Sequence, residues 1–157
     1  METVNEDIFN CVEDIIVHQT NCMGVMGSGI AKQVKEKYPD VFKGYYQYCK
    51  TSTVEEILGT ALICECSDGH YIANAFGQAN YGKDKQHTDY EALKHALIEI
   101  KDFAVEKNLS VAIPEKIGCG LGGGDWDIVF PMIQEIFDGI PCKLYSYEVK
   151  DVAKKII

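Results

Sequence analysis

Two glycine-rich stretches are the parts of this sequence whose composition and spacing best suit chemistry. Residues 118–124 contain five glycines in seven positions, and residues 24–29 contain three in six. Glycine loses more backbone freedom on folding than any other residue, so such a run indicates positive φ angles or a close approach of the backbone. We expect each stretch to follow a strand and to lead into a helix, which directs free backbone N–H groups at an anion such as phosphate. The alternative is a pair of loops that are merely tight.

The charge of the chain limits how a phosphate group is held. The net charge is −9, and all fifteen basic residues are lysines. Proteins that grip phosphate through side chains commonly use the arginine fork, and proteins that cover nucleic acid carry a basic face. We therefore expect no broad nucleic-acid binding, and we expect a phosphate ligand to be held mainly by backbone amides and helix ends.

Length and composition predict one domain over residues 1–157 and an intracellular, cytoplasmic protein. No apolar run approaches the roughly 20 residues of a membrane span, so we expect no membrane association. The seven cysteines lack the paired spacing of a zinc site, and buried, reduced thiols are the expected state. We predict no disulfide, no metal and no cofactor.

Apolar periodicity predicts the elements that must position the two loops. Strands are expected at 12–18, 60–66, 71–76, 109–113 and 142–147, with a turn at Asp68-Gly69 making 60–76 an antiparallel hairpin. Helices are expected at 30–38, 40–50, 89–107 and 125–137, the first ended by Pro39. Residues 51–56 and 77–86 are expected to be polar connectors, His87 is expected at the surface, and Thr88 and Asp125 are expected to cap helices. Alternating strands and helices with one hairpin predict an α/β fold, a three-layer α/β/α sandwich around a mixed sheet.

The glycine stretches do not match two common nucleotide-binding motifs. Neither is followed in register by the Lys-Ser/Thr pair of a P-loop. The segment Gly27-Ser28-Gly29-Ile30-Ala31-Lys32 has lysine where the third glycine of a dinucleotide fingerprint belongs. A P-loop nucleotide site is therefore excluded, and a Rossmann dinucleotide site is poorly supported.

Five segments together resemble the macrodomain family, which binds ADP-ribose, and the resemblance covers nearly the whole chain. They are Glu6-Asp7-Ile8, the strand leading into residues 21–31, Phe76-Gly77-Gln78, Thr88-Asp89-Tyr90 and residues 117–126. The set is specific, although singly only the last segment approaches specificity. The resemblance implies a macrodomain-like fold with ADP-ribose or a derivative as its ligand.

The same resemblance implies which residues bind the ligand. Asp7 would contact the adenine amino group, Ile8 would line the adenine pocket, and Asn21 would hold the distal ribose. Tyr147 or Val149 would pack on adenine. The diphosphate and ribose would be held by the backbone at Gly27, Ser28, Gly29 and Ile30 and at Gly118, Cys119, Gly120, Leu121 and Gly122. Valine at Gly122 is therefore expected to abolish binding without unfolding the protein.

Within the family, the sequence is most similar to a branch that contains ADP-ribose-1″-phosphate phosphatases and ADP-ribosyl glycohydrolases. The glycohydrolases use a lysine that falls at Ala79 here, and Lys83 or Lys85 would replace it only through a loop shift. The phosphatase pattern, a histidine followed by two residues and Asn-Cys, is matched by His18 and Asn21-Cys22. The resemblance therefore favours phosphate release from ADP-ribose 1″-phosphate, with His18 as general acid/base or nucleophile. The alternatives are a purely structural His18, removal of ADP-ribose from protein or nucleic acid, and a non-catalytic reader.

Overall fold

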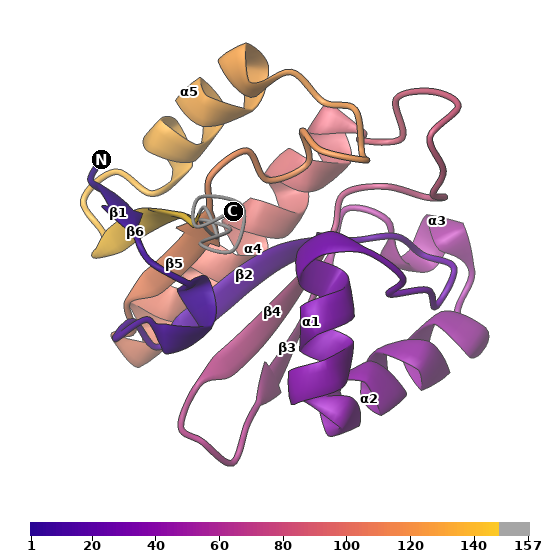
Figure 1. Cartoon of the computed structure of the whole chain (residues 1–157), viewed down its shortest axis with the longest axis horizontal. Coiled ribbons are helices and arrows are strands. Elements are labelled where there is room, and N and C mark those ends of the chain that lie inside the picture. The colour runs from indigo at the N-terminus through magenta and orange to yellow at the C-terminus, as the bar shows by residue number, and fades with distance from the viewer. Residues whose placement is uncertain (148–157) are drawn as a thin grey trace, which may run out of the picture.

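The computed structural model describes residues 1–147, in which a mixed β-sheet lies between two layers of helices (Figure 1). The strands are β1 (Thr3–Asn5), β2 (Ile15–Thr20), β3 (Ala61–Glu65), β4 (Tyr71–Phe76), β5 (Val111–Pro114) and β6 (Cys142–Ser146). The helices are the 3-10 helix η1 (Ile8–Asn10) and α1 (Gly29–Lys37), α2 (Pro39–Lys50), α3 (Val54–Ile57), α4 (Tyr90–Lys107) and α5 (Trp126–Ile136). The predicted three-layer α/β/α sandwich with a mixed sheet is confirmed.

The order of the strands places the loops that matter for function side by side. The sheet has the order β1-β6-β5-β2-β4-β3, and neighbouring strands are parallel except for the antiparallel pair β3 and β4. That pair is the predicted hairpin. Because β1, β6, β5, β2 and β4 all run the same way, the segments that follow them meet at one edge of the sheet, called here the carboxyl edge.

Both faces of the sheet are covered, as buried parallel strands require. Along β2, Ile15 and Val17 belong to the apolar cluster formed with α4 and α5, whereas Ile16 belongs to the cluster formed with α1 and α2. In Figure 1, α1 and α2 lie in front of the sheet and α4 lies behind it. The alternation along β2 therefore sends successive side chains into different layers.

Two helix starts differ from the prediction. Within 51–56, Thr53 and Glu56 form a capping box that begins α3, so this segment is not wholly a connector. The predicted cap at Thr88 is wrong, because the carboxylate of Asp89 accepts the hydrogen bond from the Ala92 N–H at 3.1 Å and starts α4. The predicted cap at Asp125 is confirmed, since its side chain accepts from the Asp127 N–H at 2.9 Å.

Strand β1 and helix η1 were not predicted. Each has three residues, which is too short for an apolar period to be recognised. Three cysteines are buried as expected, namely Cys11, Cys22 and Cys49, while the other four are half-buried. Within residues 1–147, no helix has the length and apolar character needed to cross a membrane.

Candidate functional site

A cavity of about 620 Å³ lies at the carboxyl edge of the sheet, where the chain leaves β2, β4 and β5. This volume lies within the range of small-molecule sites, roughly 300–1,000 Å³. Its lining includes both glycine stretches, which are therefore brought to a single site. The lining residues are His18, Gln19, Thr20, Asn21, Val25, Gly27, Ser28, Gly29, Ile30, Ala31, Gln78, Tyr81, Gly82, Lys83, Pro114, Glu115, Lys116, Ile117, Gly118, Gly120, Leu121 and Gly122.

Each glycine stretch has unpaired backbone donors at residues that line the cavity. Among the described residues, no acceptor pairs with the backbone N–H groups of Ser28, Gly29 and Ile30, or with those of Gly120, Leu121 and Gly122. Ser28 is the N-cap of α1, its side chain makes no capping hydrogen bond, and the first turn of α1 has no acidic residue. No side chain of α1's first turn or N-cap therefore offsets the positive end of the helix dipole. Two sets of three unpaired N–H donors thus belong to residues that line one cavity.

Residues 118–124 form the second glycine loop in chain order, after the first at residues 24–29. Hydrogen bonds from the residues just before α4 hold this second loop in place. The hydroxyl of Thr88 donates to the Gly118 carbonyl at 2.7 Å, and the N–H of Gly124 donates to the same oxygen at 2.9 Å. The carbonyl of Gly122 accepts from the N–H groups of His87 and Thr88. A Cβ on Gly122 would lie 2.5 Å from the Thr88 hydroxyl. Gly122 is therefore required for packing of the loop, and valine there is expected to destabilise the loop as well as block binding, contrary to the sequence-based expectation.

The start of α5 is not part of this cavity. None of the described α5 residues lines it. The carboxylate of Asp125 occupies the helix start, and Asp127 adds a second negative charge in the first turn. Within residues 1–147, α1 is therefore the one helix whose uncapped start lines the cavity, whereas the sequence suggested two such helices.

The side chain of Asn21 shapes the first glycine loop. Its Oδ1 accepts from the Met23 N–H at 2.9 Å and from the Tyr45 hydroxyl at 2.8 Å, and its Nδ2 donates to the Val25 carbonyl at 2.9 Å. Asn21 also lines the cavity. Its contact with a distal ribose stays a prediction, and its role within the protein is to fix the turn that leads to Gly27.

His18 lies in the cavity wall and is almost completely buried, with 1% of its surface exposed. Its Nε2 lies 2.6 Å from Oδ1 of Asn74, the residue beside it on β4. Burial lowers the pKa of His18 to about 4, and the hydrogen bond to Asn74 offsets this only in part. The ring is therefore neutral near pH 7, which suits accepting a proton better than donating one.

Two lysines and one carboxylate are the charged residues of the cavity lining among the described residues. Lys83 follows β4, and Glu115 and Lys116 follow β5. Lys116 has a φ of 65°, a left-handed conformation that is uncommon outside glycine. Lys83 reaches the cavity and Lys85 does not, so the structure separates two lysines that the sequence left equivalent.

The loop that carries Lys83 is braced by a hydrogen bond between two of its side chains. His87 Nε2 lies 3.0 Å from Asp84 Oδ1, and the His87 side chain is only 6% exposed. The prediction that His87 is a surface residue is therefore wrong. Its backbone N–H also bonds to Gly122, so the bracing connects the Lys83 loop with the second glycine loop.

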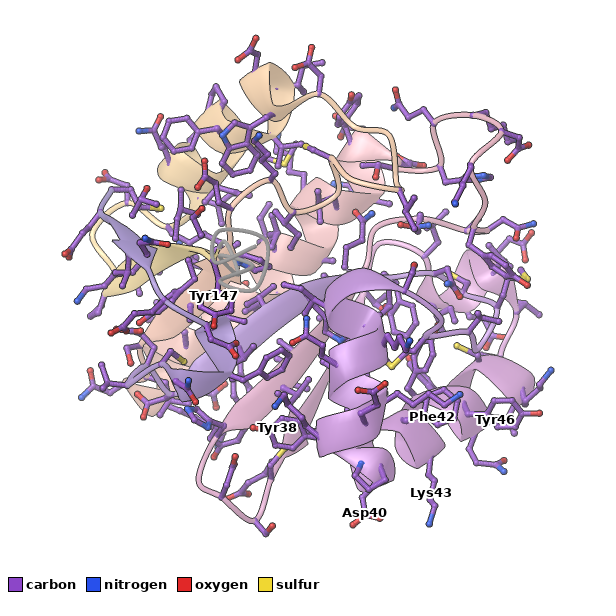
Figure 2. All side chains as sticks on the ribbon, in the orientation of Figure 1. Tyr38, Asp40, Phe42, Lys43, Tyr46 and Tyr147 are labelled. Atoms are coloured by element: carbon purple, nitrogen blue, oxygen red, sulfur yellow. The ribbon has the colours of Figure 1, made fainter. Side chains whose placement is uncertain are left out.

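Four predicted binding residues do not line the cavity. Asp7 caps η1, its Oδ1 accepting from the Phe9 N–H at 3.0 Å, and Ile8 is buried. The Cys119 N–H and thiol donate to the carbonyls of Lys116 and Ile117. Tyr147 follows β6 and is 57% exposed (Figure 2). Val149 lies outside the described residues.

Gln19, which has no predicted role, links several segments of the site through its side chain. Its Nε2 donates to Gln78 Oε1 at 2.6 Å and to Thr88 Oγ1 at 2.9 Å. It thereby links the segment after β4 to Thr88 and so to Gly118. Its partners are 59 and 69 residues away, and no local pattern indicates contacts at that separation.

The layers and the cavity define the chain as a three-layer α/β protein with a ligand-sized site at the carboxyl ends of parallel strands. A family model described as "Macro domain" matches residues 17–133. The chain therefore belongs to the macrodomain family, and the resemblance recognised in the sequence is confirmed.

Three relatives show which proteins of the family are similar. The DNA ADP-ribosyl glycohydrolase of Mycobacterium tuberculosis is 30% identical over 138 residues, which are 86% of this chain and 38% of that protein. The ADP-ribose 1″-phosphate phosphatase of Saccharomyces cerevisiae is 26% identical over 141 residues, covering 82% of this chain and 78% of that one. The structure of Thermosipho africanus DarTG in complex with ADP-ribose matches 96% of this chain and 43% of its own at a TM-score of 0.77 and 25% identity. The chain thus spans under two fifths of the DNA ADP-ribosyl glycohydrolase and most of the phosphatase.

Proposed function

We propose that this macrodomain binds ADP-ribose or a derivative in the carboxyl-edge cavity and that it is a hydrolase acting at the 1″ position. The two sets of unpaired backbone N–H groups carry the proposal, because a diphosphate between them would accept hydrogen bonds from both loops. They also agree with the composition, since a chain without arginine and with a net charge of −9 is expected to hold phosphate mainly through its backbone. A cytoplasmic location remains part of the proposal.

The order of the strands supports one direction for the ligand. The segments after β1 and β6 carry Asp7, Ile8 and Tyr147, and they adjoin the β5 loop at one end of the edge. Adenine would lie there, next to the cavity lining described above. The diphosphate would lie between the glycine loops, and the distal ribose would lie over β2 and β4, near Asn21 and His18.

Release of phosphate from ADP-ribose 1″-phosphate is the favoured reaction. A water oxygen forms a bond to phosphorus while the bond from phosphorus to the C1″ oxygen breaks, which yields ADP-ribose and inorganic phosphate. The attacking water must lose a proton and the departing oxygen must gain one. A neutral His18 can take the first proton and return it to the leaving group, so its lowered pKa favours the role of base over that of acid donor in the resting protein.

The experiment compares the wild type with His18→Gln, a substitution that keeps an amide donor near Asn74 but removes the base. Calorimetry with ADP-ribose tests binding, and phosphate release from ADP-ribose 1″-phosphate tests activity. We expect both proteins to bind ADP-ribose and only the wild type to release phosphate at an appreciable rate. Binding without phosphate release by the wild type would exclude the phosphatase and favour a reader or the second candidate.

The second candidate is removal of ADP-ribose from a macromolecule. One observation besides the similarity to glycohydrolases favours it: Lys83 lines the cavity. Wild type and Lys83→Met should be incubated with ADP-ribosylated DNA and with ADP-ribosylated protein. Release of ADP-ribose that depends on Lys83 would establish this activity, and an unchanged substrate would exclude it.

A further inference from the structure

The buried ring of His18 has one nitrogen with a fixed partner and one without. Asn74 donates from Nδ2 to the Leu62 carbonyl at 2.9 Å, which turns its Oδ1 toward His18 Nε2 at 2.6 Å. An amide oxygen only accepts hydrogen bonds, so the ring proton must be on Nε2. Asn74 is itself fully buried in the middle strands, and its orientation is set by the backbone of β3.

The other ring nitrogen of His18, Nδ1, is therefore an unprotonated hydrogen-bond acceptor. A neutral imidazole with its proton on Nε2 has only a lone pair on Nδ1. Among the described residues, Nδ1 of His18 is buried and has no hydrogen-bond partner. Buried polar atoms are nearly always paired, and an unpaired acceptor in a cavity wall indicates that a donor binds there.

We propose that Asn74 is a positioning residue that holds His18 in the Nε2–H form and so makes Nδ1 the acceptor for a hydroxyl group of the ligand's distal ribose. The inference rests on the proposed function. It specifies that, in the subsite beside β2, the protein accepts a hydrogen bond and the ligand donates it. An ionised diphosphate oxygen has no proton to donate, so it is disfavoured at Nδ1, and the distal ribose faces His18 in bound ADP-ribose. When ADP-ribose 1″-phosphate is bound, the same lone pair takes the proton of the attacking water. Because Nδ1 is covered in this structure, the contact includes a small outward movement of the cavity wall.

The first test measures the tautomer directly. Nitrogen-15 NMR of the imidazole rings in the full chain distinguishes a protonated ring nitrogen from a bare one, and the spectrum of His18→Gln assigns the His18 signals. We expect Nε2 protonated and Nδ1 bare in the wild type at pH 7. Asn74→Leu should lose this preference, whereas Ile72→Ala, a buried deletion on the same strand, should keep it. A proton on Nδ1 in the wild type, or an unchanged tautomer in Asn74→Leu, would overturn the role of Asn74.

The second test identifies the group that reaches Nδ1. Titration with ADP-ribose should shift the Nδ1 resonance, and titration with ADP, which lacks the distal ribose, should leave it nearly unchanged at saturation. An equal shift with ADP, or calorimetric binding of ADP-ribose without any shift, would overturn the inference and leave ADP-ribose binding intact. Absence of ADP-ribose binding would instead overturn the proposed function, and with it the ligand contact at Nδ1.

Discussion

The hydroxyl of Thr88 donates a 2.7 Å hydrogen bond to the carbonyl of Gly118, although the two residues are 30 positions apart in the chain. Through this bond the segment before α4 fixes the start of the second glycine loop. Gln19 donates to the same hydroxyl from β2. The loop that presents its N–H groups to the cavity is therefore shaped by residues of two other segments.

Thr88→Val removes this hydroxyl and keeps the volume of the side chain, so it should weaken ADP-ribose binding by about tenfold, or 1.4 kcal/mol. Thr88→Ser retains the hydroxyl and should bind within about threefold of the wild type. Calorimetry measures the affinities, and thermal unfolding shows whether the fold is retained. Equal affinities for the valine and serine variants would show that the Thr88 bond does not position the loop.

Gly120→Val tests the backbone loop without disturbing its packing. A Cβ at Gly120 meets no atom within 4 Å, and the residue lines the cavity. We expect affinity for ADP-ribose to fall by at least about tenfold while the unfolding temperature stays near that of the wild type. Gly44→Ala in α2 is the control, since its Cβ also meets nothing within 4 Å and it lies outside the cavity lining. Gly122→Val should instead lose stability as well, because of its contact with Thr88.

The two lysines that line the cavity should contact different parts of the ligand. Lys83 follows β4, on the side proposed for the distal ribose, and Lys116 follows β5, on the side proposed for the diphosphate. Lys83→Met should therefore weaken ADP-ribose 1″-phosphate more than ADP-ribose, and Lys116→Met should weaken both, each by up to about tenfold at low salt. Lys94→Met, on the exposed side of α4, serves as the control. Identical losses for both ligands in Lys83→Met would contradict this assignment.

Asp125 should contribute to stability and not to binding. Its carboxylate caps α5 by accepting from the Asp127 N–H, and loss of such a cap costs about 1 kcal/mol. Asp125→Ala should lower the free energy of unfolding by that amount in urea titrations and leave ADP-ribose affinity unchanged. A large loss of affinity at unchanged stability would assign Asp125 to the ligand.

Burial of neutral His18 should make stability depend on pH. Its pKa is about 4 in the folded protein and near 6.5 when unfolded, so between these values the unfolded chain binds more protons. Stability should fall as pH decreases from about 6.5 toward 4, by up to about 3 kcal/mol from this residue. Urea unfolding at several pH values should show a shallower decline for His18→Gln than for the wild type. Parallel declines would mean that His18 titrates normally in the fold.

Local chemistry in the sequence determined the elements and the two glycine loops. Apolar periodicity located β2, the hairpin and the long helix, and the residue before α5 was recognised as its cap because capping acts over a few neighbouring positions. The short range of these signals also explains the predictions that were wrong or absent. Nothing near Thr88 shows that its hydroxyl serves Gly118 instead of capping α4, and β1 is too short to carry a pattern.

Only the tertiary structure decided which groups are free to act. Parallel pairing of β2 with β4 places Asn74 beside His18, and this contact fixes the ring while burial keeps it neutral. The strand order also brings Lys83 and Lys116 to one cavity and leaves the start of α5 outside it. These contacts join segments that are distant in the chain and adjacent in the sheet. Composition and local spacing do not specify such neighbours, so the sequence alone could not show how strongly these groups interact.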